Sequence, residues 1–502
     1  MLCITGIEKT QCLLSRRLKR NASFPMQEIR FDALTRMPKS ADFFPIAPQK
    51  IIACCRRIKD KGLFAGQEER RIRRLEKACS LGVGWVDIEA DLPETSFQKI
   101  QAAARGSRTK ILRSLHLDSD AGTHEIQGAF TLLARSPGDA IKLCVPMDDA
   151  ADLAIFLRAP QDRPAVLVAT GSAGILSRAL YNRINSAWTY IAADRATAPI
   201  PDMPDVKTAA LLGLPLGRKT PFFVLLGGPS IAASPGFDVY NSFFRDRSFE
   251  GCYLPAVTGR LEETFAVLKQ LGLSGASVTT PHKIAAGALV DEMDDGGRNT
   301  KSVNTLYLRE GVWHGANTDL HAVTALAERL GTRPGQKAMI LGTGGFARAA
   351  AWALADLGVN VVMLGRSLLD EAGPWEDCLP LSALKEIPFH ILLNATPVGG
   401  NGKGGSPVSR NLDLQGKIVI DSVLSGKVTP LVRHAAKAKA HVATGVDIWV
   451  EQGARQLDLF RCPEATPEEL RVLALKCGKV KAVPKSGRPA RSPGKACGKT
   501  TG

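Results

Sequence analysis

Short apolar segments recur along the first third of the chain, and longer polar or amphipathic stretches separate them. Eight of these segments have the length of a strand: Leu2–Ile7, Met26–Phe31, Ile51–Cys55, Val86–Glu89, Lys110–Leu115, Ala140–Cys144, Ala165–Ala169 and Tyr190–Ala193. The stretches between them are long enough for helices, and one of them, Glu68–Leu81, carries a charged face. Eight strands that alternate with helices predict an α/β fold with a (β/α)₈ barrel at the start of the chain.

A different alternation follows the barrel. The segment Gly213–Thr220 contains glycine, proline and two basic residues, which indicates a linker, and Phe222–Leu226 predicts a new strand. From Lys337 the pattern is a strand, a glycine turn, an apolar helix (Phe346–Leu357) and a second strand (Asn360–Leu364). This is the order of a nucleotide-binding βαβ unit. Two later apolar segments continue the predicted sheet: Ile391–Leu393 and Lys417–Ile420.

Composition narrows the class of protein. Apolar residues make up 45% and charged residues 23% of the chain, which is ordinary for a globular protein. No apolar run reaches the ~18 residues that a membrane span needs, and the run at Met1–Ile7 is too short for a signal peptide, so we expect a cytoplasmic protein. The 11 cysteines form no CxxC pairs or zinc-finger spacing, so we expect neither a disulfide framework nor a metal site.

The net charge of +16 is partly a property of one end of the chain. Lys476–Gly502 contains eight Lys or Arg, no acidic residue, and many Gly, Pro and Ser, a composition typical of a solvated disordered tail. This tail lacks the aromatic residues that stack on bases, which argues against nucleic acid as a partner.

Residues capable of acid–base chemistry occur at the ends of the predicted barrel strands, the end at which barrel active sites lie: Glu28, Arg30, Arg56, Glu89, His116 and Lys142. A buried lysine can condense with a ketone, and a nearby histidine can then remove a proton from the adjacent carbon and protonate a departing hydroxyl. We expect Arg30, Arg56 and Arg178 to favour the neutral amine of Lys142, because like charges disfavour the ammonium form.

The glycine turn carries the second candidate site. Gly342 permits a tight turn, Gly344 permits close approach of a pyrophosphate, and Ala347 permits helix–strand packing. Arg366 follows the next strand, where an NAD site usually has an acid, so we expect NADPH as the cofactor. The other residues of this predicted cofactor site are Gly345, Phe346, Gly365, Ser367 and Thr396.

Lys283 and Asp319 precede this turn in the sequence. Reduction of a ketone creates an alkoxide, which needs a proton donor and nearby positive charge. A lysine paired with a carboxylate provides both, so these two residues are the predicted proton-transfer pair.

Both ordered sets of residues resemble known enzymes of the shikimate pathway. Glu28, Arg30, Cys55-Arg56, His116, Lys142 and Ser177-Arg178 occur in the order found in type I 3-dehydroquinate dehydratase. Thr279, Lys283, Asn317-Thr318-Asp319 and the glycine turn resemble shikimate dehydrogenase. Together they are similar to the bifunctional dehydratase–dehydrogenase family, which acts on 3-dehydroquinate and 3-dehydroshikimate.

The resemblance implies further roles. Arg178 would bind the substrate carboxylate and Glu89 would hold the histidine. The remaining residues that it implies for substrate binding are Glu28, Arg30, Arg56 and Thr197 in the barrel, and Ser234, Thr279, Asn304 and Gln452 in the second enzyme. The implied domains are a barrel at 1–213, a linker at 214–220, a substrate-binding domain at 221–321 completed by 440–475, a Rossmann domain at 322–439 and the basic tail at 476–502.

Four positions depart from the family pattern. Pro201 replaces a lid glutamine, Ala232 one of two serines, Ser277 an asparagine and Leu424 a tyrosine. These changes leave open two alternatives for the second half, a quinate or shikimate dehydrogenase of altered specificity, and a ligand sensor without turnover. The sequence makes no prediction of oligomeric state.

Overall fold

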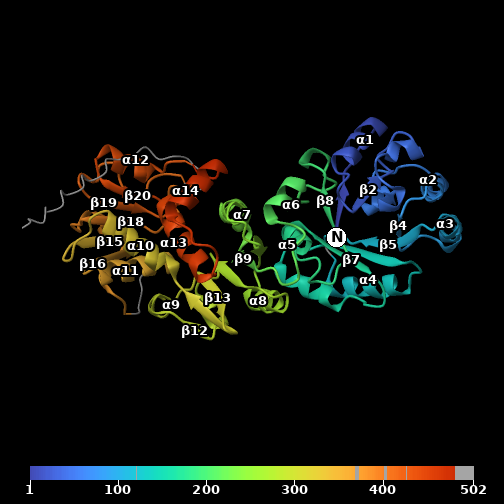
Figure 1. Cartoon of the computed structure of the whole chain (residues 1–502). Helices are drawn as coiled ribbons and strands as arrows, with labels where there is room; N and C mark the ends of the chain where they lie inside the picture. Colours follow the sequence, from blue (N-terminus) through green and yellow to red (C-terminus); the bar gives the residue numbers. More distant parts are fainter. Residues whose placement is uncertain (120, 368–371, 401–403, 426, 481–502) are drawn as a thin grey trace, which may run out of the picture. The chain divides into compact units, whose positions relative to one another are not determined.

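The computed structural model describes residues 1–119, 121–367, 372–400, 404–425 and 427–480 (Figure 1). The chain forms two compact units. The first contains Met1–Met293, Val303–Gly315 and Phe460–Pro463, and the second contains Asp294–Ser302, Ala316–Leu459 and residues 464–480. Most of the predicted basic tail, 481–502, lies outside the described residues.

The first unit begins with eight parallel strands in the order β7-β6-β5-β4-β3-β2-β1-β8. They are β1 (Leu2–Thr5), β2 (Met26–Arg30), β3 (Ile51–Cys54), β4 (Trp85–Glu89), β5 (Lys110–His116), β6 (Ala140–Pro146), β7 (Ala165–Thr170) and β8 (Thr189–Ala192). The segment before β8 meets β7, because Ala187 N donates to Ala165 O at 2.8 Å. The predicted barrel is confirmed as a nearly closed one.

Helices follow most of the barrel strands: α1 (Gln11–Arg20), α2 (Glu68–Ser80), α3 (Glu94–Ser107), α4 (Thr123–Arg135), the 3-10 helix η4 (Ala150–Arg158), α5 (Gly174–Ala179) and α6 (Val206–Leu212). The charged face predicted near residue 68 belongs to α2, which buries Ile72 and Leu75 against β4 residues Val86 and Ile88. Since side chains alternate across a strand, Asp87 and Glu89 occupy the opposite face of β4.

A second, mixed sheet completes the first unit, in the order β10-β9-β11-β13-β14-β12. Its elements are β9 (Phe222–Gly227), η7 (Pro229–Ala233), α7 (Gly236–Asp246), β10 (Cys252–Val257), α8 (Leu261–Gln270), β11 (Gly275–Val278), β12 (Glu292–Met293), β13 (Thr305–Arg309) and β14 (Val312–Ala316). Leu176 and Leu180 of the barrel share one hydrophobic core with Leu254 of β10, and Leu216 of the predicted linker is buried in it. The linker therefore joins two domains that pack directly on each other.

The second unit contains a parallel sheet in the order β17-β16-β15-β18-β19-β20. Its strands are β15 (Lys337–Leu341), β16 (Asn360–Gly365), β17 (Trp375–Pro380), β18 (Ile391–Asn394), β19 (Ile418–Asp421) and β20 (His441–Ala443). The strand order reverses between β15 and β18, and ligands of open α/β sheets bind at such a point. The predicted Rossmann fold is confirmed.

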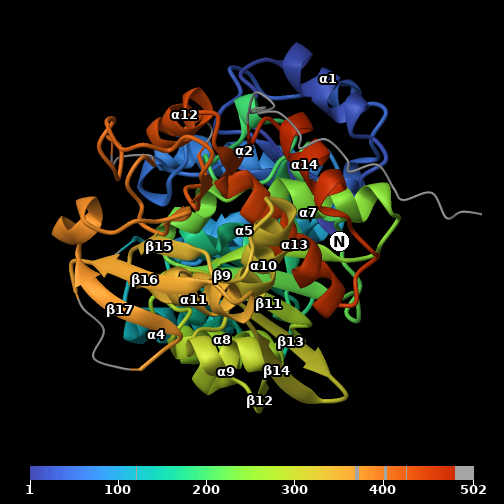
Figure 2. The same ribbon diagram turned by 90° about the vertical axis from the view of Figure 1, so that its left-hand side faces the viewer.

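The helices of the second unit are α9 (Asp295–Thr300), α10 (Thr318–Arg329), α11 (Gly345–Asp356), α12 (Pro430–Lys437), α13 (Gly445–Leu459) and α14 (Pro467–Lys476). Helix α10 packs between α11 and α13 (Figure 2). Of the predicted returning segment 440–475, only Phe460–Pro463 belongs to the first unit, where the Phe460 ring stacks on Phe223 with centroids 4.8 Å apart. Within the described residues, no helix combines the length and the apolarity that crossing a membrane requires.

Candidate functional site

The barrel encloses a cavity of about 630 Å³. Six of the residues predicted for the first site line it: Glu28, Arg30, Arg56, His116, Lys142 and Arg178. They come from strands β2, β5 and β6, from the residues that follow β3, and from helix α5. The structure therefore gathers in one cavity residues that are spread over 150 positions of sequence, from Glu28 to Arg178.

Lys142 is buried beside two carboxylates. Its Nζ lies 2.7 Å from Asp87 Oδ2 and 3.7 Å from Glu28 Oε2, and 4.6 Å from the centroid of the Tyr190 ring. Burial is the largest influence on the pKa of Lys142 and lowers it, but Asp87, Tyr190 and Glu28 together outweigh burial and raise that pKa well above its ordinary value. Arg56 lowers the pKa of Lys142, as expected, but its effect is smaller than that of the neighbouring anionic groups, so the ammonium form is favoured and not the neutral amine.

Asp87 was not among the predicted site residues, although the alternation of side chains along its strand could have indicated it. It lies two positions before Glu89, so both side chains point to the same face of β4. Asp87 is the one that reaches the lysine, and it also forms an ion pair with Arg56 at 3.3 Å. The two cations hold the pKa of Asp87 below its usual value despite burial.

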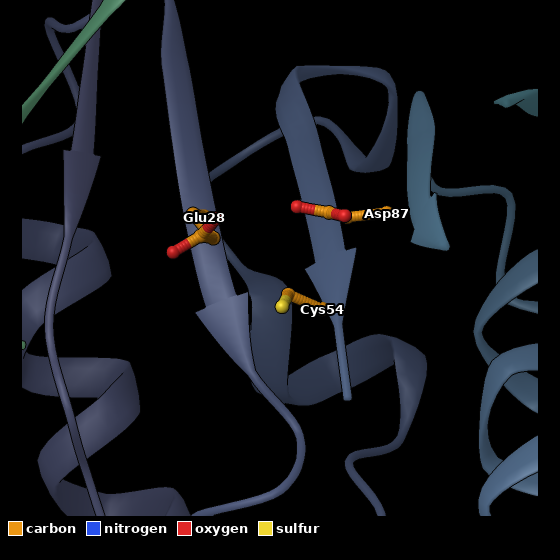
Figure 3. A group of neighbouring side chains, drawn as sticks. All are labelled: Glu28, Cys54 and Asp87. Carbon is orange, nitrogen blue, oxygen red and sulfur yellow. The ribbon is translucent and has the colours of Figure 1, made fainter. Parts of the chain in front are cut away.

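Asp87 belongs to a cluster with the side chains of Glu28 and Cys54, which come from neighbouring strands (Figure 3). One ligand-type atom of each lies within 4.8 Å of the others. The ammonium of Lys142 already provides a cation to both carboxylates. Burial raises the pKa of the Cys54 thiol well above its usual value, so the thiolate that binds metals is disfavoured. The cluster is better described as the anionic surroundings of Lys142 than as a metal site.

His116 has the properties of a base. Burial, assisted by Arg56 and Lys142, lowers the pKa of His116 well below its ordinary value. The imidazole is therefore neutral near pH 7 and able to accept a proton. Among the described residues its Nδ1 has no hydrogen-bond partner, so the interior of the barrel does not fix its tautomer.

Two predicted barrel residues do not line the cavity. Glu89 accepts a hydrogen bond from Arg71 Nη1 at 2.7 Å, so the geometry does not support its predicted role in holding His116. Thr197 donates to Asp194 Oδ1 at 2.8 Å. The neighbouring residues 199–201 do line the cavity, and Pro201 places an apolar ring there.

The cavity favours an anionic ligand. Arg178 is 1% exposed and donates to the carbonyls of Ala169 (2.7 Å) and Gly174 (2.9 Å). Burial lowers the pKa of Arg178 to about 10, which still leaves it charged at pH 7. Arg56 and Lys61 add further positive charge to the lining, and a carboxylate is the natural partner of such groups.

In the first unit, residues predicted for the second site lie at the ends of β9 and β11. Thr279 N donates to Leu226 O (2.9 Å), and Val303 N donates to Lys283 O (2.7 Å). Asn304 is buried, and its carbonyl accepts from Val278 N at 2.8 Å. These backbone bonds bring Thr279, Lys283 and Asn304 to one edge of the mixed sheet.

Two further positions at this edge bear on the substrate. Ser234 follows helix η7, and its Oγ accepts from Gly236 N at 3.3 Å, which leaves the hydroxyl proton available to a ligand. Ala232 lies within the same short helix. Ser277 on β11 hydrogen-bonds Tyr253, so this replacement of an asparagine has a structural partner of its own.

In the second unit, Asp319 and Gln452 lie near each other. Asp319 is 4% exposed in the first turn of α10, and its backbone N donates to the N-cap side chain of Asn317 at 3.1 Å. The preceding Thr318 donates to Gln452 Oε1 at 3.4 Å. Lys283 and Asp319 belong to different units, so their pairing stays a prediction.

The glycine turn fits a dinucleotide. Gly342 has φ +115°, and a Cβ there would lie 3.2 Å from Ala395 O, so glycine is required. Gly344 caps α11 without a side-chain hydrogen bond, and a Cβ there would meet no atom within 4 Å. This open space at a helix N-terminus suits a pyrophosphate. Ala347 lies in the first turn of α11, and its side chain is buried.

The remaining predicted cofactor residues surround the point where the strand order reverses. Thr396 follows β18, and its hydroxyl donates to Asn394 Oδ1 at 2.7 Å. Arg366 and Ser367 are exposed directly after β16. Gly345 lies against Ser302, and Gly365 lies against Thr343, so both have tight surroundings. An exposed arginine at the end of β16 fits the 2′-phosphate of NADP.

Family models match both halves of the chain. Residues 2–211 match the model described as type I 3-dehydroquinase, and residues 226–306 match the shikimate dehydrogenase substrate binding domain. The chain belongs to the bifunctional 3-dehydroquinate dehydratase/shikimate dehydrogenase family. The family predicted from the two ordered sets of residues is confirmed.

Bifunctional relatives and a separate shikimate dehydrogenase both support this membership. A chloroplastic bifunctional 3-dehydroquinate dehydratase/shikimate dehydrogenase of Arabidopsis thaliana is 24% identical over 82% of this chain and 72% of its own. The shikimate biosynthesis protein AroDE of Chlamydia pneumoniae is 25% identical over 79% and 82%. An NADP(+) shikimate dehydrogenase of Syntrophobacter fumaroxidans is 31% identical over 48% of this chain and 87% of its own.

Proposed function

We propose that this protein catalyses two consecutive reactions of the shikimate pathway. The barrel dehydrates 3-dehydroquinate to 3-dehydroshikimate, and the second enzyme reduces that product to shikimate with NADPH. The observation that carries the first assignment is the convergence of Lys142, His116 and Arg178 on one cavity. The cofactor assignment is supported by the open turn at Gly344, by Arg366, and by relatives named as NADP(+) enzymes.

Dehydration begins with substrate binding. Arg178 pairs with the substrate carboxylate and places the ketone near Lys142. The Lys142 ammonium gives its proton to solvent, a step that Arg56 favours, and the free amine condenses with the ketone to give an imine and water. The imine carbon withdraws electrons from its neighbour, so the C–H bond there becomes acidic.

His116 then moves the proton. As a neutral imidazole it takes the proton from the carbon next to the imine, and it returns that proton to the hydroxyl that leaves as water. Hydrolysis of the imine releases the unsaturated ketone and restores Lys142. Asp87 stabilises the cationic states of Lys142 at both ends of this cycle.

Reduction needs a proton donor at the second site. The glycine turn and Arg366 would hold NADPH, which would supply the hydride when bound. Lys283 stabilises and protonates the alkoxide oxygen, and a proton from solvent then restores the Lys283 ammonium, with Asp319 as the proposed carboxylate partner of this transfer. Thr279, Asn304, Ser234 and Gln452 bind the substrate hydroxyls and carboxylate.

Borohydride trapping tests the first half of the proposal. Incubation of the chain with 3-dehydroquinate and borohydride should attach the substrate covalently at Lys142, as seen in a peptide map. Lys61→Ala is the matched control, because Lys61 lines the same cavity but has no role in the imine. An adduct on another lysine, or none at all, would contradict the mechanism.

A further inference from the structure

The turn that follows β10 contacts a loop of the barrel. Asp149 is the N-cap of η4, and its Oδ1 accepts from Thr258 Oγ1 at 3.0 Å while its Oδ2 accepts from Gly259 N at 2.8 Å. Arg260 lies 3.6 Å from Asp149 and also forms an ion pair with Asp152. A barrel residue therefore fixes the backbone of a turn that belongs to the dehydrogenase half.

The same turn holds the segment that carries Lys283. Thr258 O lies 2.8 Å from His282 Nε2, and because a carbonyl only accepts, the imidazole donates this hydrogen bond. His282 is 7% exposed and directly precedes Lys283, whose own carbonyl accepts from Val303 N at 2.7 Å. The backbone around Lys283 is thus held from two sides, by Thr258 through His282 and by Val303.

Asp149 also continues the loop after β6, which carries Lys142. Pro146 and Asp148 of this loop line the dehydratase cavity, and Asp149 is not part of that lining. The two domains have other contacts that do not involve Asp149. Arg183 of the barrel donates to Leu271 O at 2.8 Å, and Phe156 of η4 shares a hydrophobic core with Phe265 of α8. Loss of the Asp149 carboxylate should therefore leave the domains together.

We propose that Asp149, a residue of the dehydratase barrel, is a positioning residue for the dehydrogenase reaction. It fixes the Thr258 turn, and the turn fixes His282. His282 in turn fixes the direction in which the Lys283 side chain extends from the backbone. This inference rests on the proposed role of Lys283 in proton transfer. It makes the dehydrogenase dependent on a contact between the two enzymes of one chain.

Asp149→Ala in the full-length chain tests the proposal. Because small displacements of a catalytic group reduce rates strongly, kcat for 3-dehydroshikimate reduction should fall by roughly ten- to a hundredfold. The Kd for NADPH and the yield of the Lys142 borohydride adduct should stay within about twofold of wild type. Asp149→Asn retains Oδ1 as an acceptor and should recover part of the lost rate.

Asp152→Ala is the matched control, because Asp152 pairs with the same Arg260 and does not touch Thr258. It should leave kcat unchanged.

A second variant, Thr258→Val, should lower kcat as Asp149→Ala does. In the double variant, the fold-reduction in kcat should be smaller than the product of the two single fold-reductions.

Three outcomes would overturn the inference: equal losses in both activities, which indicate general loosening; equal effects of Asp149→Ala and Asp152→Ala; or fully additive losses in the double variant. Absence of NADPH oxidation by wild type with 3-dehydroshikimate would overturn the proposed function itself, and with it this inference.

Discussion

Lys142 and Asp87 form an ion pair in the interior of the barrel, with Nζ 2.7 Å from Oδ2 and both side chains almost fully buried. The pair favours the protonated amine, although imine formation needs the neutral amine. The carboxylate therefore controls when the nucleophile becomes reactive.

Asp87→Asn should shift the reactivity of Lys142 to lower pH. Without the carboxylate, burial and Arg56 both disfavour the ammonium, so the pKa of Lys142 should fall. The measurement is the rate of borohydride-trapped adduct formation as a function of pH. Glu89→Gln on the same strand should leave this profile unchanged, because Glu89 pairs with Arg71. If Asp87→Asn formed the adduct only at the same pH as wild type or at a higher pH, Asp87 would not control the protonation of Lys142.

His116 should make the fold sensitive to mild acid. Its pKa is lowered in the folded protein, so below about pH 6.5 the unfolded chain binds a proton that the folded chain does not. Stability from this group is complete above pH 6.5 and decreases as pH falls toward the folded pKa. Urea unfolding of wild type should lose about 1 kcal/mol more between pH 7 and pH 5.5 than unfolding of His116→Gln. Equal losses in both proteins would show that His116 titrates normally.

Sequence reasoning located the barrel strands to within about two residues and brought six cavity residues together, because hydrophobic alternation and the order of polar residues at strand ends are local signals. The resemblance implied a role for Glu89 and none for Asp87, although both lie on one face of β4. Which of the two reaches Lys142 depends on the stagger between strands, a property of the closed sheet. Leu216 of the predicted linker is buried by partners distant in sequence, which a local pattern of glycine, proline and basic residues does not reveal.

Arg366→Ala should impair binding of NADPH much more than that of NADH. Arg366 is exposed after β16, where a charge-assisted contact with the 2′-phosphate is available only to NADPH. We expect the KM for NADPH to rise about tenfold or more, and that for NADH to stay within about twofold. Equal effects on the two cofactors in steady-state assays would remove Arg366 from the cofactor site.

Lys283→Ala and Asp319→Asn should each reduce kcat for 3-dehydroshikimate reduction by about 10²–10⁴-fold, the usual contribution of a general acid–base group. Neither change touches the glycine turn, so the Kd for NADPH should be retained. Dehydration at Lys142 should also continue, because the two reactions use separate residues. A wild-type chain that binds shikimate and NADPH without turnover, and is unaffected by either change, would instead be a ligand sensor.

Supplying the purified chain with 3-dehydroquinate and NADPH and following nicotinamide absorbance tests both activities at once. NADPH should be oxidised only when 3-dehydroquinate is present, and shikimate should form. Lys142→Ala should abolish oxidation with 3-dehydroquinate and retain it with 3-dehydroshikimate. Failure of wild type to oxidise NADPH with either substrate would contradict the assignment of two consecutive activities to this chain.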